Sequence, residues 1–338
     1  MGTGRGKSWV IYAAIVEKGC RTLVLCHNIQ TADTMYEGII KNTTIPKEDV
    51  GLVHSKSKIP RTGIIDVMTH ASFVKNYKEL VDTYEMICYD ECDYNLSFPI
   101  RNDYDCMVGA LITLSPKYLY WFTGTPYRAE GWVEVLNRIF GEVWTYCDDY
   151  NYTPNITQVF YRYDWEYDFE TFADLMCNLV RSEKRREAQL KLFNANKRKR
   201  NLILTKSVEE SKVLSEKIEW SILLNWTLSK KELDDNMDLV NKAIKDGRGF
   251  TIVWTIDKMG RGVDIPPIDT VFLFSPVRFR WTVVQAVWRA LRKFPDKVDV
   301  MIYDWCDMPI LKKQQQGRLK DYSAEYKIKK DDFRFIRL

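Results

Sequence analysis

Short apolar runs alternate with amphipathic stretches along the chain, and the runs have the length of β-strands. In the first half they lie at 21–26, 63–69, 85–89 and 117–122, and a helical pattern spans 31–40. Runs with few polar residues are typical of strands buried on both faces of a parallel sheet, with helices covering both faces. The pattern therefore predicts a first α/β unit.

The same alternation begins again after residue 200. Apolar runs lie at 201–205, 221–224, 250–255, 270–274 and 299–303, and helical patterns span 208–219, 230–246 and 282–292. Turn residues at 148–154 and a charged helical stretch at 183–200 separate the halves, so we expect the domain boundary at 150–165. Two tandem α/β units account for the whole chain. We interpret the basic run Lys197–Arg200 as the solvated end of the charged helix rather than as a nucleic-acid contact.

The composition is that of a globular protein with more than one domain. A chain of 338 residues exceeds one ordinary core, and 46% hydrophobic with 28% charged residues excludes a disordered chain. The net charge of +4 permits nucleic-acid binding without requiring it. The eight cysteines form no Cys-x-x-Cys pair and there are three histidines, so we expect no zinc site and a reducing compartment. No apolar run approaches the roughly 20 residues of a membrane span, and we expect a soluble, cytoplasmic protein without membrane association.

Residues 1–8, MGTGRGKS, have the pattern of a phosphate-binding loop. In the template Gly-x-x-x-x-Gly-Lys-Ser/Thr, backbone N–H groups cradle phosphates, the lysine binds the outer phosphates and the hydroxyl binds Mg²⁺. Gly6, Lys7 and Ser8 fill the last three positions, and Met1 stands where the template has its first glycine. The apolar stretch at 9–16 predicts the helix that follows such a loop.

The strand that normally precedes a phosphate-binding loop has no counterpart in this sequence. We therefore expect that the chain lacks the beginning of its first domain. We also expect weak ATP binding for that reason, and a gain in both stability and affinity when a strand is restored.

Two adjacent carboxylates, Asp90 and Glu91, follow the apolar run at 85–89. The first can hold Mg²⁺, and the second can orient or deprotonate an attacking water. Farther along, Thr123 and Thr125 lie in a turn after the run at 117–122 and could sense the hydrolysing phosphate. Taken alone, the segment with Asp90 and Glu91 has a simpler interpretation as an acidic turn, and the segment with Thr123 and Thr125 as an ordinary turn.

The second half offers groups that suit a transferring phosphoryl group. Thr255 and the glycine-containing segment 260–266 close an apolar run, and glycines there permit close approach to a ligand. Gln285, Arg289 and Arg292 follow at a spacing that puts all three on one helix face, where they could stabilise phosphoryl charge. A surface helix with arginines is the alternative.

Together these segments resemble superfamily 2 helicases, the DExD/H-box class of nucleic-acid-dependent ATPases. In chain order, the segments similar to motifs I, Ia, Ib, II, III, IV, V and VI are MGTGRGKS, TLVLCHNIQTA, DVMTHASF, ICYDECD, WFTGTPYR, LILTKSVEES, TIDKMGRGVDIP and QAVWRALRK. The resemblance covers nearly the whole chain. It implies two RecA-like domains, at 1–155 and 156–310, followed by a C-terminal tail at 311–338, with the first domain lacking its N-terminal strand.

The resemblance also implies ATP and Mg²⁺ as cofactors, and a nucleic-acid partner that is DNA rather than RNA, bound by a monomer. The residues that it implies for nucleotide binding are Gly2, Thr3, Gly4, Arg5, Gly6, Lys7, Ser8, Asp90, Gly262 and Asp264, with Ser8 and Asp90 on the metal. For hydrolysis and its coupling it implies Glu91, Gln285, Arg289, Arg292, Thr123 and Thr125. For nucleic-acid contact it implies Asn28, Thr69, Arg128 and Thr255.

The subfamily is indicated by motifs III and VI. Their forms, TGTP and Gln-x-x-x-Arg-x-x-Arg, are unlike those of DEAD-box RNA helicases and are similar to those of DNA helicases, most of all the phage UvsW-type group, whose members would act in the host cytoplasm. Asp93 replaces a frequent histidine and Trp288 the usual glycine. Two alternatives to an ATP-dependent DNA helicase stay open: a nucleic-acid-binding remnant with weak or no ATPase activity, and an RNA helicase.

Overall fold

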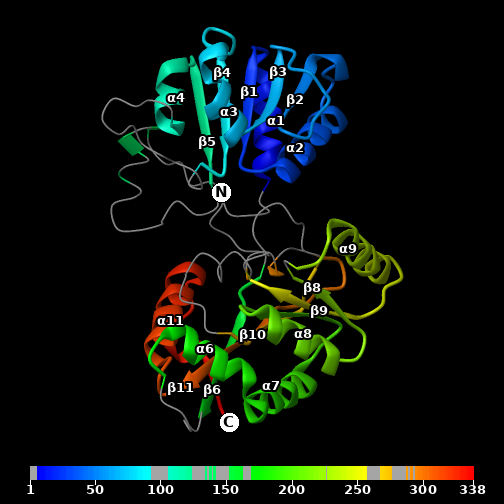
Figure 1. Cartoon of the computed structure of the whole chain (residues 1–338), viewed down its shortest axis with the longest axis vertical. Coiled ribbons are helices and arrows are strands. Elements are labelled where there is room, and N and C mark those ends of the chain that lie inside the picture. The colour runs from blue at the N-terminus through cyan, green and yellow to red at the C-terminus, as the bar shows by residue number, and fades with distance from the viewer. Residues whose placement is uncertain are drawn as a thin grey trace. The chain divides into compact units, whose positions relative to one another are not determined.

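The computed structural model contains two compact units, Met1–Asp148 and Asp149–Leu338, which we describe separately (Figure 1). The structure describes residues 6–92, 106–123, 134, 137–138, 140–141, 152–162, 169–225, 227–256, 267–275, 287, 290–291 and 294–338. Within these residues, no helix has both the length and the apolar composition that crossing a membrane requires.

The first unit contains a five-stranded sheet in the order β2-β3-β1-β4-β5, and every strand pair is parallel. Its strands are β1 (Thr22–Cys26), β2 (Val50–Val53), β3 (Ile65–Thr69), β4 (Met86–Asp90) and β5 (Tyr118–Phe122). Its helices are α1 (Lys7–Lys18), α2 (Ile29–Asn42), α3 (His70–Asn76) and α4 (Met107–Leu114), with the short 3₁₀ helices η1 (Lys47–Asp49) and η2 (Tyr77–Leu80). One face of the sheet packs against α1 and α2, and the other packs against α3, η2 and α4.

Burial on two faces explains the uninterrupted apolar runs. In β1, Val24 and Cys26 belong to the core beneath α1 and α2, whereas Leu23 and Leu25 belong to the core beneath α3 and α4. All residues of β1, β3 and β4 are buried. Strand β5 differs, because each of its five residues is only partly buried and no other described strand pairs with its second edge.

The second unit contains a seven-stranded sheet in the order β12-β6-β11-β10-β7-β9-β8, again with parallel pairing throughout. Its strands are β6 (Asn155–Arg162), β7 (Arg200–Thr205), β8 (Ser221–Leu224), β9 (Phe250–Thr255), β10 (Thr270–Leu273), β11 (Met301–Met308) and β12 (Arg334–Arg337). Its helices are α6 (Phe172–Arg181), α7 (Glu183–Asn196), α8 (Val208–Lys217), α9 (Lys230–Lys245) and α11 (Lys312–Tyr326), with η3 (Lys330–Asp332). Helices α7 and α8 cover one face, and α9 and α11 cover the other.

These two parallel sheets with helices on both faces confirm the predicted α/β class. One expectation was wrong. The charged helix ends at Asn196, and Arg200 is not its solvated end but a buried residue of β7, paired with Asp269 and Asp296. Residues 311–338, which we expected as a tail, form α11 and β12, and β12 pairs with β6.

Candidate functional site

The N-terminus of α1 begins at a left-handed glycine and has no side-chain cap. Gly6, the residue before the helix, has a φ of 84°, in the left-handed region that glycine adopts without strain. No side chain caps the first turn, so its N–H groups have no side-chain acceptor from the helix start. Open N–H groups and the positive end of the helix dipole favour a phosphate at this position. The preceding loop residues Gly2, Thr3, Gly4 and Arg5 lie outside the described residues.

Lys7, in the first turn of α1, meets both carboxylates that follow β4. Its Nζ forms a hydrogen-bonded ion pair with Oε1 of Glu91 and lies 3.7 Å from Oδ1 of Asp90. The three side chains are between 10% and 13% exposed, so the cluster is largely withdrawn from water but remains reachable. The structure thus brings Lys7 together with two predicted carboxylates that lie more than 80 residues farther along the chain.

Among the described residues, this cluster sets one lysine against two carboxylates. The pKa of Asp90 is raised to about 6, chiefly by burial; the positive charge of Lys7 opposes the rise and the negative charge of Glu91 adds to it. Oδ1 of Asp90 accepts no hydrogen bond from any described residue. A buried carboxylate oxygen that has no donor among the described residues, beside a second carboxylate, fits a divalent cation that prefers oxygen ligands. Asp90 would hold such an ion, and Ser8, in the first turn of α1, stays its second predicted ligand.

Strand register explains why the other predicted residues of the first unit gather at the same edge. Cys26 of β1 is aligned with Thr69 of β3, and Asp90 of β4 with Phe122 of β5. Asn28, Thr69, Glu91 and Thr123 therefore follow the carboxyl ends of neighbouring strands. Asn28 caps α2 by accepting from the N–H of Thr31, and Thr69 caps α3 by accepting from the N–H of Ser72. Thr123 is buried.

His70 is a residue of this edge that the sequence did not single out. It is 1% exposed, one ring nitrogen lies 3.2 Å from the carbonyl oxygen of Asp90, and its ring packs edge-on against Tyr89. It thereby links the start of α3 to the backbone of the acidic pair. The segment DVMTHASF contained it, but nothing in that segment indicated a contact with β4. Glu91 was selected, but its φ of 50°, an unusual conformation for a side-chain-bearing residue, was not foreseen.

In the second unit, Thr255 ends β9 and is fully buried, aligned with Thr205 at the end of β7. Its hydroxyl makes no hydrogen bond with any described residue. The remaining predicted positions lie outside the described residues: Thr125, Arg128, Gly262, Asp264, Gln285, Arg289 and Arg292.

Fold and site together define an α/β protein in which an uncapped helix start lies beside an acidic pair. Residues 184–294 match the helicase conserved C-terminal domain. The whole chain matches Saccharomyces cerevisiae Dbp5 bound to RNA and ADP BeF3, with 14% identity, a TM-score of 0.64 and 84% of that chain covered. It also matches, over its whole length, a DEAD box protein from Methanococcus jannaschii, with 15% identity, a TM-score of 0.52 and 86% coverage. No curated protein matches the chain in sequence.

The match of residues 184–294 to a helicase domain agrees with the resemblance of the motifs to superfamily 2 helicases, and the solved structures show that the chain shares their fold. T4 UvsW also matches over the full chain, with 17% identity, 72% of that chain covered and a TM-score of 0.44, a likeness too small to decide a subfamily. The UvsW-type assignment therefore stays a prediction.

Proposed function

We propose that the protein is an ATP-dependent DNA helicase or translocase. The observation that carries the proposal is the contact of Lys7 with Asp90 and Glu91 beneath the uncapped start of α1. A cation for outer phosphates, an oxygen ligand for Mg²⁺ and a second carboxylate for water are the parts that phosphoanhydride hydrolysis needs. The helicase C-terminal match of residues 184–294 supports a motor rather than a simple ATPase.

Each residue of the cluster has a distinct role in this proposal. When nucleotide binds, the γ-phosphate replaces the carboxylates as the partner of Lys7, and the N–H groups of α1 donate to the phosphate oxygens. Asp90 and Ser8 would hold Mg²⁺, and the ion would supply positive charge to the site. Glu91, released from Lys7, is then free to accept a proton from water or to orient it.

The proposal also assigns roles to residues of the second unit. Gln285, Arg289 and Arg292 contribute positive charge and hydrogen bonds to the transferring phosphoryl group, and Gly262 and Asp264 contact the nucleotide. Thr123 and Thr125 couple hydrolysis to nucleic-acid contact through Asn28, Thr69, Arg128 and Thr255. Hydrolysis then alternates closed and open arrangements, which moves the motor along one strand.

An RNA helicase is the second candidate, because Dbp5, whose fold the chain shares, was captured with RNA. The forms TGTP and Gln-x-x-x-Arg-x-x-Arg favour DNA. A third possibility is a remnant that binds nucleic acid with weak or no hydrolysis. ATPase assays with single-stranded DNA, branched DNA and RNA separate the three: stimulation by DNA supports the proposal, stimulation by RNA alone favours the second candidate, and no stimulation favours the third.

The site itself is tested by two variants. Lys7→Ala should abolish nucleotide-dependent activity without unfolding the protein, whereas Lys18→Ala, at the exposed end of the same helix, should leave turnover unchanged. Glu91→Gln should retain ATP binding and lower turnover about 10²- to 10⁴-fold. Parental turnover in Lys7→Ala, or loss of ATP binding in Glu91→Gln, would refute these roles.

A further inference from the structure

Positive charge is concentrated at the C-terminal end of the chain. Residues 311–338 contain nine lysines and arginines against four aspartates and glutamates, a net charge of +5, whereas the whole chain carries +4. The excess positive charge of the protein therefore resides in α11, η3 and β12. Such asymmetry is the electrostatic signature of a surface that meets a polyanion.

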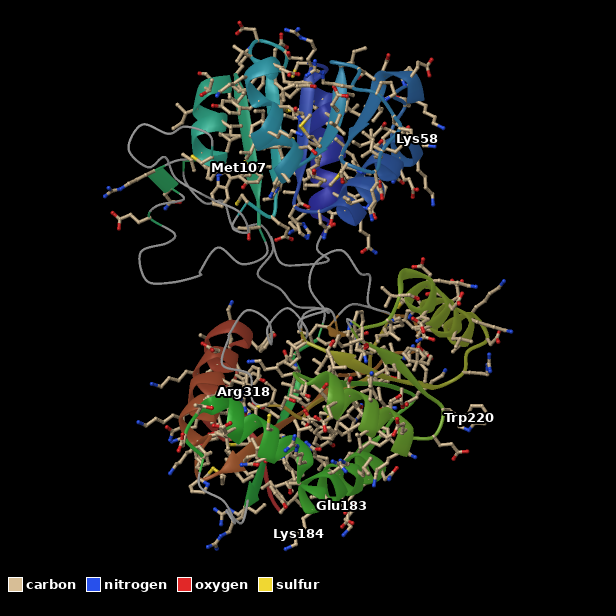
Figure 2. The ribbon with its side chains drawn as sticks, viewed as in Figure 1. Lys58, Met107, Glu183, Lys184, Trp220 and Arg318 are labelled. Atoms are coloured by element: carbon tan, nitrogen blue, oxygen red, sulfur yellow. The ribbon has the colours of Figure 1, made fainter. Side chains whose placement is uncertain are left out.

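The buried face of helix α11 includes polar side chains that hydrogen-bond to the sheet. Nε2 of Gln315 donates to Oε1 of Gln158 at 2.8 Å, and Nε of Arg318 donates to Oδ2 of Asp304 at 3.0 Å. Nη2 of Arg318 also donates to the carbonyl of Trp305 at 3.1 Å. Figure 2 labels Arg318 on this helix, beside the sheet. Because hydrogen bonds of fixed geometry hold this face, α11 cannot roll on β6 and β11, and its outer face has a fixed direction.

The outer face of α11 carries lysines and small residues. Lys313 and Lys320 are exposed and seven residues apart, which places them on one side of the helix, and Lys327 is exposed directly after the last turn. Exposed Gly317 and Ala324 lie between these lysines on the same side, and a Cβ added at Gly317 would meet no atom within 4 Å. None of the three lysines forms an ion pair with another described residue. We call Lys313, Lys320 and Lys327 the α11 lysine row.

The composition of this face selects a phosphate backbone over other anionic partners. A membrane-binding helix needs large apolar residues beside its lysines, and a protein interface is usually centred on aromatic or arginine anchors. The α11 lysine row has Gly317 and Ala324 in their place. Small residues between cations let a rigid, regularly charged rod approach the helix closely.

The length and direction of the α11 lysine row also suit a contact with duplex DNA. The row extends over about 21 Å at the helical rise per residue, which corresponds to roughly six base pairs of duplex. Helix α11 begins just after the carboxyl end of β11, and β12, which follows it, runs parallel to β6. The row therefore starts at the edge of the sheet where Thr255 lies and leads away from it.

We propose that the α11 lysine row binds the phosphate backbone of a DNA duplex that leaves the second unit at the end of the sheet where Thr255 lies. The proposal rests on the proposed function for the presence of DNA, and it adds a second contact surface that recognises duplex. Each lysine releases condensed counterions when it meets a phosphate, so the contact is measurable through its salt dependence.

The test compares two triple variants of the full chain. Lys313→Gln, Lys320→Gln and Lys327→Gln remove the row, and Lys231→Gln, Lys242→Gln and Lys245→Gln remove the same charge from exposed positions of α9. Affinity for a fluorescent forked duplex is measured between 50 and 300 mM salt. The row variant should show a slope of log K against log salt that is smaller by about 2 to 3. The α9 variant should retain the parental slope, and ATPase activity without DNA should be unchanged in both.

The outcomes separate this inference from the proposed function. Equal slopes for the two variants would overturn the inference, even when DNA still stimulates the ATPase. A smaller slope in the row variant, found together with a parent protein that hydrolyses no ATP, would support the inference and refute the proposed motor. Equal losses on single-stranded DNA and duplex would overturn duplex recognition. Loss of binding only to vesicles of phosphatidylserine and phosphatidylcholine would assign the row to a membrane surface instead. Matching thermal melting curves show that the exposed substitutions leave the fold intact.

Discussion

Each unit buries a cluster of one cation and two carboxylates, and the two clusters differ in how fully the carboxylates are satisfied. In the second unit, Arg185 pairs with Glu210 at 2.7 Å and with Asp307 at 2.8 Å. Both oxygens of Glu210 and both of Asp307 accept hydrogen bonds, from Arg185, Gln189, Ser275 and Trp305. In the first unit, Oδ1 of Asp90 accepts none from the described residues.

The difference separates architecture from a ligand site. Burial alone would lower the pKa of Arg185, but Asp307 and Glu210 raise it above its ordinary value, so the guanidinium stays charged and the cluster is closed. The pKa of Asp90 instead rises to about 6, because burial and Glu91 outweigh Lys7. The first cluster, in which Oδ1 of Asp90 has no donor among the described residues, is therefore the candidate ligand site, whereas the second fixes α7, α8 and β11 to each other.

The largest effect should come from opening the complete cluster. Arg185→Met leaves two carboxylates buried without their cation and should lower the free energy of unfolding by about 3 to 5 kcal/mol. Lys184→Met, one residue earlier and exposed on the outside of the unit (Figure 2), should change it by less than about 0.5 kcal/mol. Urea unfolding of both variants measures the difference. A loss below 1 kcal/mol for Arg185→Met would contradict a closed cluster.

Replacing Asp by Asn should have opposite effects on stability in the two clusters. The raised pKa means that, between about pH 4 and pH 6, folded Asp90 binds more protons than unfolded Asp90, so stability falls as pH rises through this window. Asp90→Asn removes that loss and should stabilise the first unit at pH 7 by about 1 to 3 kcal/mol, while it abolishes Mg²⁺-dependent nucleotide binding. Asp307→Asn should destabilise the second unit by a similar amount.

Hydrogen exchange of peptides from β4 and from β11, measured between pH 4 and pH 7, assigns each effect to its unit. Destabilisation by Asp90→Asn at pH 7, or a pH profile equal to that of the parent, would show that the first cluster is structural.

The same contrast explains which features the sequence could predict. Strands β1, β4, β7 and β9 are apolar throughout because both faces are buried, and their positions were predicted to within one residue. The second half of β11 was missed, because Asp304 and Asp307 look like loop residues until their buried arginine partners are known. Helix α11 was missed for the same reason, since its buried face includes Gln315 and Arg318.

The site follows the same rule. Lys7, Asp90 and Glu91 could be predicted together because each occurs in a motif with a fixed place at a strand end. The contact of His70 with the backbone of Asp90 could not, because it depends on the pairing of β3, β1 and β4 rather than on any local pattern.

A third prediction concerns a buried lysine of the second unit. Lys297 is 6% exposed, donates to the carbonyl of Ala290 and lies over the ring of Tyr152, and burial lowers its pKa to about 8. Between pH 8 and about 10.5 the unfolded chain therefore binds more protons, so stability rises with pH across this window. Lys297→Met should remove that rise, which we expect to be about 1 to 2 kcal/mol. Urea unfolding at pH 7.5 and pH 10 measures it, and Lys320→Met, at an exposed position, is the control. An undiminished rise in Lys297→Met would assign it to another group.

The smallest effects should come from one glycine in each unit, again with opposite signs. Gly6 has a φ of 84° at the start of α1, so a Cβ there is strained, and Gly6→Ala should destabilise the first unit by about 1 kcal/mol. Gly317 lies inside α11 with open space around it, so Gly317→Ala should stabilise the second unit by about 0.5 to 1 kcal/mol through a higher helix propensity. Hydrogen exchange of α1 and α11 measures both.

Because the proposed anion site needs the left-handed turn at Gly6, Gly6→Ala should also weaken ATP binding, while Gly317→Ala should not affect it. Equal ATP affinities for the two variants would show that the backbone at Gly6 serves only the helix and not the nucleotide.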